Sequence, residues 1–183
     1  MREMRKQLVN SILPVFILGC LVAYALDNLH PANTAVTIDP ASLFTVSRVI
    51  DGDTIRAIYG KKEITVRLLG IDAPETVDPR KPVGCFGNEA SKELKDILRG
   101  RNVRLELNPE REVTDKYARY LAYVYRDDGL FVNEYLIVNG FAREYTYGSA
   151  YSLQKRFKAA EKQARGHGNG LWKKCFGAAG HNS

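Results

Sequence analysis

The sequence has little of the chemistry that binds soft metal ions. Its 183 residues include three cysteines and no Cys-x-x-Cys pair, and its three histidines do not follow a metal-ligand spacing: His30, His167 and His181. A zinc site is therefore disfavoured. Outside the first 26 residues only Cys85 and Cys175 remain, and such a pair in an exported protein is a candidate disulfide. The sequence by itself leaves open whether the two meet.

Internal repeats, low-complexity tracts and a strong excess of one charge are also missing. Lys and Arg number 27 against 21 Asp and Glu, a net charge of +6, and 45% of the residues are hydrophobic. This composition supports a packed core and disfavours wholesale disorder. The modest positive excess favours a polyanionic partner, either nucleic acid or an anionic membrane surface, without requiring one.

Long apolar runs are confined to the N-terminus, where a basic head precedes the uncharged residues 8–26. This order is typical of an export signal. Cleavage after Ala25 would release a soluble protein, whereas the uncut run is long enough to span the ~30 Å core of a bilayer. Lipid attachment at Cys20 is a third possibility, disfavoured because the apolar run continues past it. We expect an extracytoplasmic protein, secreted or anchored to the membrane by residues 8–26.

Past a linker at residues 27–42 the pattern becomes that of β-structure. Runs rich in Val, Ile, Thr and aromatic residues are separated by turn residues. They predict strands at residues 43–50, 54–59, 63–71, 102–107 and 119–125.

Helical spacing separates and follows these strands. It predicts a helix capped by Asn88 and ended by Gly100, then helices at residues 132–139 and 149–165. In the last helix an apolar stripe favours core packing over a partner surface: Leu153, Phe157, Ala160 and Ala164. Five strands with a helix after the third are the layout of an OB-fold barrel. We predict a mainly β, α+β fold: a five-stranded OB-fold barrel with about three helices. It occupies residues 43–174, follows an N-terminal signal or anchor helix (1–26), and precedes a tail (175–183).

Acidic residues gather where predicted strands end. Asp51 and Asp53 flank a glycine at the first turn, and Asp72 and Glu75 follow the third strand. In an antiparallel meander the start of strand two and the end of strand three share an edge, so we expect Asp53 and Asp72 to face each other on one rung. Two carboxylates and a backbone carbonyl suit Ca²⁺. Each motif alone is also an ordinary turn sequence.

Two arginines strengthen the interpretation of these acidic motifs. Arg67 lies within an otherwise apolar strand, where it costs desolvation unless an anion faces it, and Arg119 opens another strand. A guanidinium holds two phosphate oxygens at once, so the combination indicates phosphoryl-transfer chemistry. Surface salt bridges would explain each arginine but not their joint placement.

Several motifs in this order resemble the thermonuclease (staphylococcal nuclease) family over about residues 43–174. They are VIDGDT (49–54), VRLLGIDAPET (66–76), GNEAS (87–91), TDKYARYLAYVY (114–125), VNE (132–134) and GLW (170–172). The resemblance implies an OB-fold endonuclease that depends on Ca²⁺, hydrolyses DNA and RNA, prefers single strands and leaves 3′-phosphates. It implies no protein partner, and we expect a monomer.

The resemblance also implies a metal site. Asp53 and Asp72 would bind Ca²⁺ through their side chains and Ala73 through its carbonyl, where the family often has threonine. Asp51 would hold metal-bound water.

Further roles follow from the same resemblance. Glu75 would orient or deprotonate the attacking water, while Arg67 and Arg119 would neutralise the phosphorus centre. The remaining matches concern the substrate: Lys116 and Tyr117 would hold its terminal phosphate, and Tyr145 and Tyr147 would line a base pocket. For the last two, half-buried packing is an equally good explanation.

Two other classes of function remain. A non-catalytic OB module that binds single strands predicts the loss of at least one of Arg67, Glu75 and Arg119, and all three are present. A structural protein of the cell envelope has only the N-terminal segment in its favour.

Overall fold

The computed structural model describes residues 38–76, 80 and 82–177. The predicted signal or anchor segment therefore lies outside the described residues, as do residues 178–183. Within the described part, no helix is both long and apolar enough to cross a membrane.

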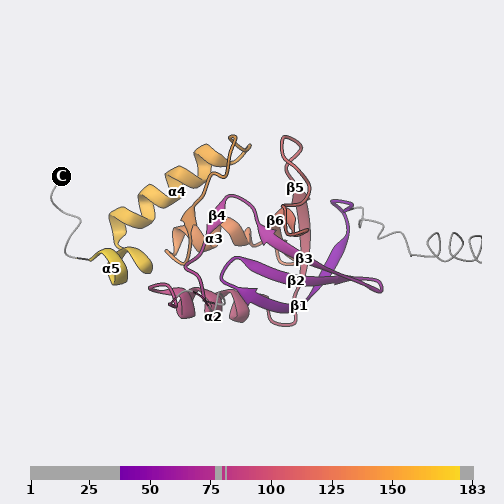
Figure 1. Cartoon of the computed structure of the whole chain (residues 1–183), viewed down its shortest axis with the longest axis horizontal. Helices are drawn as coiled ribbons and strands as arrows, with labels where there is room; N and C mark the ends of the chain where they lie inside the picture. Colours follow the sequence, from indigo (N-terminus) through magenta and orange to yellow (C-terminus); the bar gives the residue numbers. More distant parts are fainter. Residues whose placement is uncertain (1–37, 77–79, 81, 178–183) are drawn as a thin grey trace, which may run out of the picture. The chain divides into compact units, whose positions relative to one another are not determined.

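Five strands close into a barrel in the order β1-β2-β3-β6-β5 (Figure 1). Only the β3–β6 pair is parallel; the other pairs are antiparallel. The closed barrel with flanking helices confirms the predicted α+β class and is consistent with an OB-fold. The strands are β1 Leu43–Asp51, β2 Thr54–Tyr59, β3 Lys62–Leu68, β5 Asn102–Leu107 and β6 Tyr120–Arg126.

The barrel interior is filled by the apolar residues of these strands. Phe44, Ile55, Val66, Val103 and Val124 are fully buried, one from each strand. Burying side chains of this size stabilises the fold by about 1.5–3 kcal/mol each. The barrel is thus a packed scaffold whose rim, rather than its interior, is available for a site.

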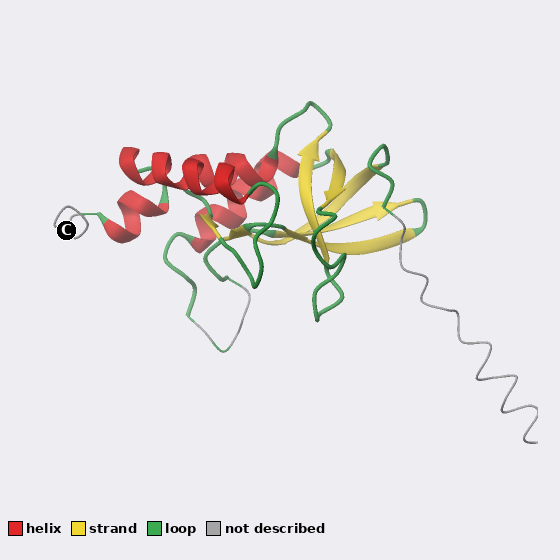
Figure 2. Cartoon of the chain, turned by 90° about the horizontal axis from the view of Figure 1, so that it is seen from above, coloured by secondary structure: helices red, strands yellow, loops and turns green. Residues whose placement is uncertain are grey.

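Among the described residues four helices are present, and they lie on one side of the barrel in the view of Figure 2. They are α2 Gly87–Leu98, α3 Val132–Val138, α4 Gln154–His167 and α5 Leu171–Phe176. The sequence predicted about three, and the one it missed is α5. This helix has six residues, too few to show helical periodicity. Leu171 and Trp172 bury it against Ala164 of α4.

Two predicted helix starts are wrong. Helix α2 begins at Gly87 with Phe86 at the N-cap in a left-handed conformation, so Asn88 is not the cap. Helix α4 begins at Gln154 rather than at residue 149, because Tyr151 is buried in the preceding turn. The apolar face of α4 is buried as predicted, with Phe157, Ala160 and Ala164 in the core.

The third strand is shorter than predicted. It ends at Leu68, and β4 (Ile71–Asp72) leaves the barrel to pair with β7 (Arg143–Glu144). The break lies at Gly70, whose φ is 78° and whose added Cβ would lie 2.8 Å from the Tyr151 ring. Only glycine fits this position without strain.

This break changes the pairing of the acidic residues. Asp72 pairs with Arg143, and Thr54 pairs with Arg67, so the expectation that Asp53 and Asp72 share a rung is wrong. Their carboxylates are brought together by a side chain instead.

Cys85 and Cys175 form a disulfide, with their Cα atoms 6.0 Å apart. It joins the segment before α2 to α5. The sequence had left this pairing open.

Candidate active site

Arg67 of β3 gathers two carboxylates at the barrel rim. Its Nη1 lies 2.9 Å from Asp53 Oδ2, and its Nη2 lies 3.4 Å from Asp72 Oδ1. Nη1 also donates to the carbonyl of Ile71 at 3.0 Å. The side chain is only 14% exposed, so these anionic and carbonyl partners compensate for its desolvation.

Asp53 is buried in the turn between β1 and β2. Its Oδ2 accepts the backbone N–H of Ala73 at 2.9 Å, and its Oδ1 accepts the hydroxyl of Thr54 at 2.9 Å. Burial raises the pKa of Asp53, and the Arg67 charge and these two hydrogen bonds offset only part of that rise. A further positive charge near this carboxylate would stabilise its ionised form.

Asp51 closes the same turn. Its Oδ1 accepts the backbone N–H of Gly52 at 2.8 Å and the hydroxyl of Thr76 at 2.6 Å. Gly52 is packed so closely that an added Cβ would lie 2.7 Å from the Cβ of Ala73. The turn and the segment after β4 are therefore fixed against each other.

The loop that carries Lys116 and Tyr117 is built around Asp115. Its Oδ1 accepts the N–H groups of Tyr117 and Arg119 at 2.9 and 3.0 Å, and its Oδ2 accepts Arg119 Nε at 2.7 Å. Burial alone would raise the pKa of Asp115, but these hydrogen bonds outweigh it and the pKa is lowered. Ala118 has a φ of 59°, which completes the tight turn. Arg119 is thereby held at the edge of the site with 30% of its side chain exposed.

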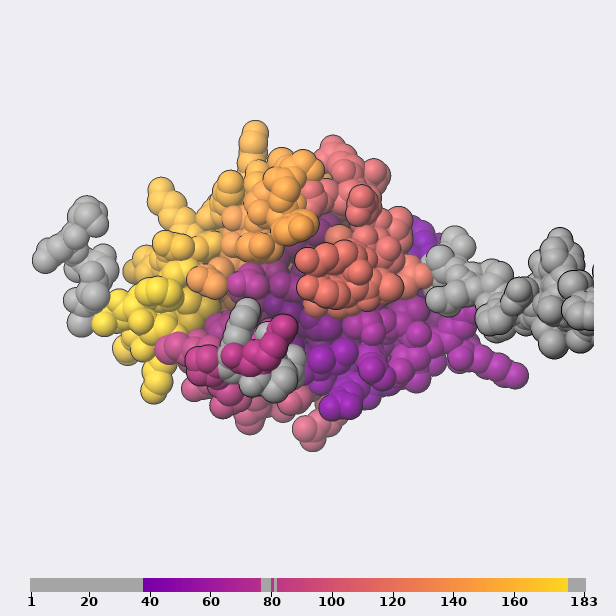
Figure 3. All heavy atoms as spheres, in the orientation of Figure 1, coloured from indigo at the N-terminus to yellow at the C-terminus, as the bar shows by residue number. Residues whose placement is uncertain are grey.

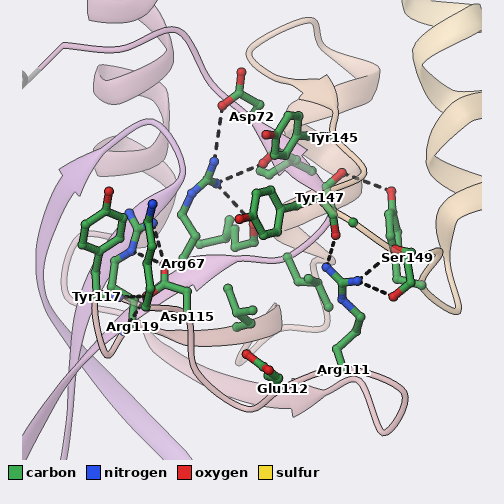
Figure 4. A pocket seen from close by; sticks show the side chains of 18 of the residues that line it. Arg67, Asp72, Arg111, Glu112, Asp115, Tyr117, Arg119, Tyr145, Tyr147 and Ser149 are labelled. Carbon is green, nitrogen blue, oxygen red and sulfur yellow. Dashed lines mark hydrogen bonds and ion pairs between the residues drawn. The ribbon is translucent and has the colours of Figure 1, made fainter.

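Arg67 and the loop around Asp115, together with the segment after β7, line an open cavity of about 670 Å³ (Figure 4). In Figure 3 the β5–β6 connection and the segment before α4 are neighbours on the same face of the protein. The predicted site residues that line the cavity are Arg67, Asp72, Lys116, Tyr117, Arg119, Tyr145 and Tyr147. Asp53 does not line the cavity but contacts Arg67, which does. Asp51 and Glu75 are not among the described residues that line it.

The three predicted tyrosines of this cavity are exposed, whereas Tyr151, which also lines it, is buried. Tyr117 and Tyr147 are each 67% exposed and Tyr145 is 46% exposed. The rings of Tyr145 and Tyr147 stack with centroids 6.4 Å apart, and Lys116 Nζ lies 5.1 Å from the Tyr117 ring centroid. Exposed aromatic rings beside cations are typical of surfaces that bind nucleotides.

Known proteins are similar in sequence to the part of the chain that builds this site. Residues 65–174 match the profile of the family described as "Staphylococcal nuclease homologue". The chain belongs to this family.

Individual relatives agree with the membership. A thermonuclease of Staphylococcus hyicus is 41% identical over 70% of this chain and 75% of its own length. A thermonuclease of Staphylococcus intermedius is 33% identical over 93% of this chain and 100% of its own length. The endonuclease YncB of Bacillus subtilis is 40% identical over 71% of this chain and 61% of its own length.

Two arginines near this site were not predicted from the sequence. Arg143 Nη2 lies 3.1 Å from Asp72 Oδ2, and Arg111 binds the segment that carries Tyr147. Neither belongs to a motif that we recognised. Their partners are distant along the chain, so no local pattern could have indicated them.

The acidic side chains of this family member fit a Ca²⁺ ion in part. Asp53 and Asp72 both contact the Arg67 guanidinium, and their carboxylates offer the hard oxygen atoms that Ca²⁺ prefers. Among the described residues, no group of three or more His, Cys, Asp or Glu side chains could hold a metal ion. Since Ca²⁺ takes about 6–8 oxygen ligands, backbone, water and phosphate oxygens would have to complete the set.

Proposed function

We propose that this member of the nuclease family hydrolyses DNA and RNA in a Ca²⁺-dependent reaction, prefers single strands and leaves 3′-phosphate ends. The enzyme class, a hydrolase of phosphodiester bonds, follows from the family and from relatives named thermonuclease and endonuclease. The observation that carries the finer proposal is the convergence of Asp53 and Asp72 on Arg67 beside an open cavity.

In this proposal Asp53, Asp72 and the carbonyl of Ala73 hold Ca²⁺, with Asp51 acting through a bound water. The ion would polarise the phosphate and make the attacking water more acidic. The raised pKa of Asp53 supports the proposal. Its neighbours offset only part of the cost of burying the charged carboxylate, so a nearby cation would stabilise the ionised form.

The chain's own residues would do the rest of the chemistry. Arg67 and Arg119 stabilise negative charge that develops on the phosphate, and Glu75 orients the attacking water and accepts its proton. In the structure both guanidinium groups are paired with aspartates, so the substrate phosphate would compete with Asp72 for Arg67 and with Asp115 for Arg119.

The substrate would be held by the exposed side chains of the cavity. Lys116 and Tyr117 bind a terminal phosphate, and the Tyr145 and Tyr147 rings stack on a base. Stacking needs bases that are free of a duplex, which supports a preference for single strands.

We also propose that the enzyme acts outside the cytoplasm as a monomer, either secreted or anchored by residues 8–26. The basic and apolar N-terminal pattern supports this proposal, and so does the Cys85–Cys175 disulfide, because disulfides persist in oxidising compartments. Fractionation of cells that produce the chain is the test. Recovery of the protein only from the cytoplasm would contradict it.

Metal removal tests the proposed activity. Purified protein is incubated with heat-denatured DNA, then with a Ca²⁺ chelator, then with excess Ca²⁺. We expect cleavage to stop with the chelator and to return with Ca²⁺. Cleavage that persists in chelator would contradict the metal dependence, and binding without cleavage in Ca²⁺ would favour a non-catalytic OB module.

A further inference from the structure

One side of the cavity is a short exposed segment that follows β7. Residues 145, 147, 148 and 149 are all exposed, and two of them carry the stacked tyrosine rings. The start of the segment is fixed because Tyr145 N–H donates to the Gly70 carbonyl at 3.0 Å. What fixes its far end is a side chain from another element.

That side chain is Arg111, in the connection from β5 to β6. Its Nη1 donates to the carbonyl and the hydroxyl of Ser149 at 2.9 and 2.7 Å, and its Nη2 donates to the carbonyl of Tyr147 (Figure 4). Gly148, between the two carbonyls, has a φ of 71°. This left-handed turn lets one guanidinium bind the main chain on both sides of it.

We propose that Arg111 is a positioning residue that fixes Tyr147 at the cavity and thereby increases affinity for the nucleic acid. The inference rests on the proposed function, in which Tyr147 stacks on a base. Because Arg111 binds main-chain carbonyls, it fixes the backbone that carries the ring. A ring held in place loses less freedom when a base stacks on it, so binding is tighter.

A competing role for Arg111 is direct binding of a substrate phosphate. In the structure both of its terminal nitrogens are already engaged by the segment. A positioning role predicts that its effect depends on the Tyr147 ring, whereas phosphate binding predicts an effect that does not.

The first test separates affinity from turnover in Arg111→Ala acting on heat-denatured DNA. We expect KM to rise about fivefold to tenfold with kcat within about twofold of the unaltered enzyme, since only binding is lost. Arg111→Lys should show the same split, because an ammonium cannot span both carbonyls as a two-pronged guanidinium does. Arg56→Ala, which removes an exposed ion pair with Glu63, is the matched control and should leave KM unchanged.

A double-mutant cycle then identifies the route of the effect. In a Tyr147→Ala background, Arg111→Ala should add little to KM, because residues that act through each other are not additive. A KM penalty that persists without the Tyr147 ring would overturn the proposal in favour of phosphate binding. Full recovery of KM in Arg111→Lys would overturn it in the same way.

Amide hydrogen exchange gives a readout that does not depend on activity. In Arg111→Ala the amides of residues 147–149 should exchange faster while those of the barrel strands do not change. Unchanged exchange at residues 147–149 would overturn the positioning role of Arg111. Absence of cleavage by the unaltered chain would instead overturn the proposed function, so the two failures are distinguishable.

Discussion

Arg67 shows how a single side chain organises the site. Its side chain is only 14% exposed, and its guanidinium lies beside the carboxylates of Asp53 and Asp72. An arginine in such a position loses hydration, and its partners must compensate for that loss through good geometry. Planar, two-pronged contacts provide this geometry, and a lysine ammonium provides only a point charge.

Arg67→Lys should therefore abolish most activity while retaining the fold. The variant keeps a positive charge near Asp53 but cannot hold two oxygen atoms in a fixed plane. We expect kcat on heat-denatured DNA to fall by about 10²–10³-fold, as when one transition-state donor is removed. Thermal unfolding should show a single transition near that of the unaltered protein.

Arg56→Lys is the matched control for this substitution. Arg56 lies on β2, is 48% exposed and pairs with Glu63 at 3.2 Å. Its replacement should leave kcat unchanged. If Arg67→Lys cleaves DNA within a few-fold of the unaltered enzyme, Arg67 has no direct part in the reaction.

At the scale of elements, the site depends on connections rather than on the strands themselves. The β1–β2 turn supplies Asp51 and Asp53, the β5–β6 connection supplies the Asp115–Arg119 loop, and the segment after β7 supplies two tyrosines. Such connections have few buried apolar residues, so polar contacts decide their conformation. Asp115 is the clearest case, because one carboxylate accepts three hydrogen bonds within its own loop.

Asp115→Asn should loosen this loop and lower the free energy of unfolding by about 1–2 kcal/mol, since hydrogen bonds to a charged acceptor are lost. The pKa of Asp115 lies below its ordinary value of 3.8, so its contribution is present above that pH and is lost as the pH falls through the lowered value. The difference between the variant and the unaltered protein should therefore be full at pH 7 and shrink below about pH 4. Urea denaturation at pH 7 and at pH 3 measures this difference in the free energy of unfolding.

Asp127→Asn is the control for Asp115→Asn. Asp127 accepts Arg101 Nε at 3.0 Å on the surface, where an ion pair contributes about 0–1 kcal/mol. An effect of Asp115→Asn that is no larger than that of Asp127→Asn, or that is the same at pH 3 and pH 7, would contradict the role given to the loop.

At the scale of the whole molecule, a covalent link ties the helical side together. The Cys85–Cys175 disulfide joins positions 90 residues apart in a chain of 183, so it closes a loop of about half of the chain in the unfolded state. The chain-entropy account assigns a loop of this length a stabilisation of about 4 kcal/mol. Neither cysteine is among the described residues that line the cavity.

The double substitution Cys85→Ser and Cys175→Ser should therefore lower stability and spare catalysis. We expect the free energy of unfolding to fall by up to about 4 kcal/mol and kcat at 25 °C to stay within about twofold. A reductant should lower the stability of the unaltered protein toward that of the variant and leave the variant unchanged. Equal unfolding free energies for the two proteins would show that the disulfide adds nothing to the fold.

The sequence by itself determined the elements whose causes are local. Strands β2 and β5 begin and end where the alternating pattern placed them, and α3 ends one residue before its predicted end. The motifs also indicated seven of the residues that line the cavity, because turn residues and isolated charges in apolar strands are visible without coordinates. The periodicity of side chains is a property of neighbouring residues, so it can be recognised along the chain.

Only the tertiary structure decided the features that depend on distant partners. Strand β3 stops at Leu68 because Tyr151, far along the chain, is packed against Gly70. Asp72 consequently pairs with Arg143 on β7, and Arg111 reaches across to Tyr147 and Ser149. The disulfide and the short helix α5 belong to the same class. In each case the stabilising contact forms only when the chain is already folded, so no pattern within one segment encodes it.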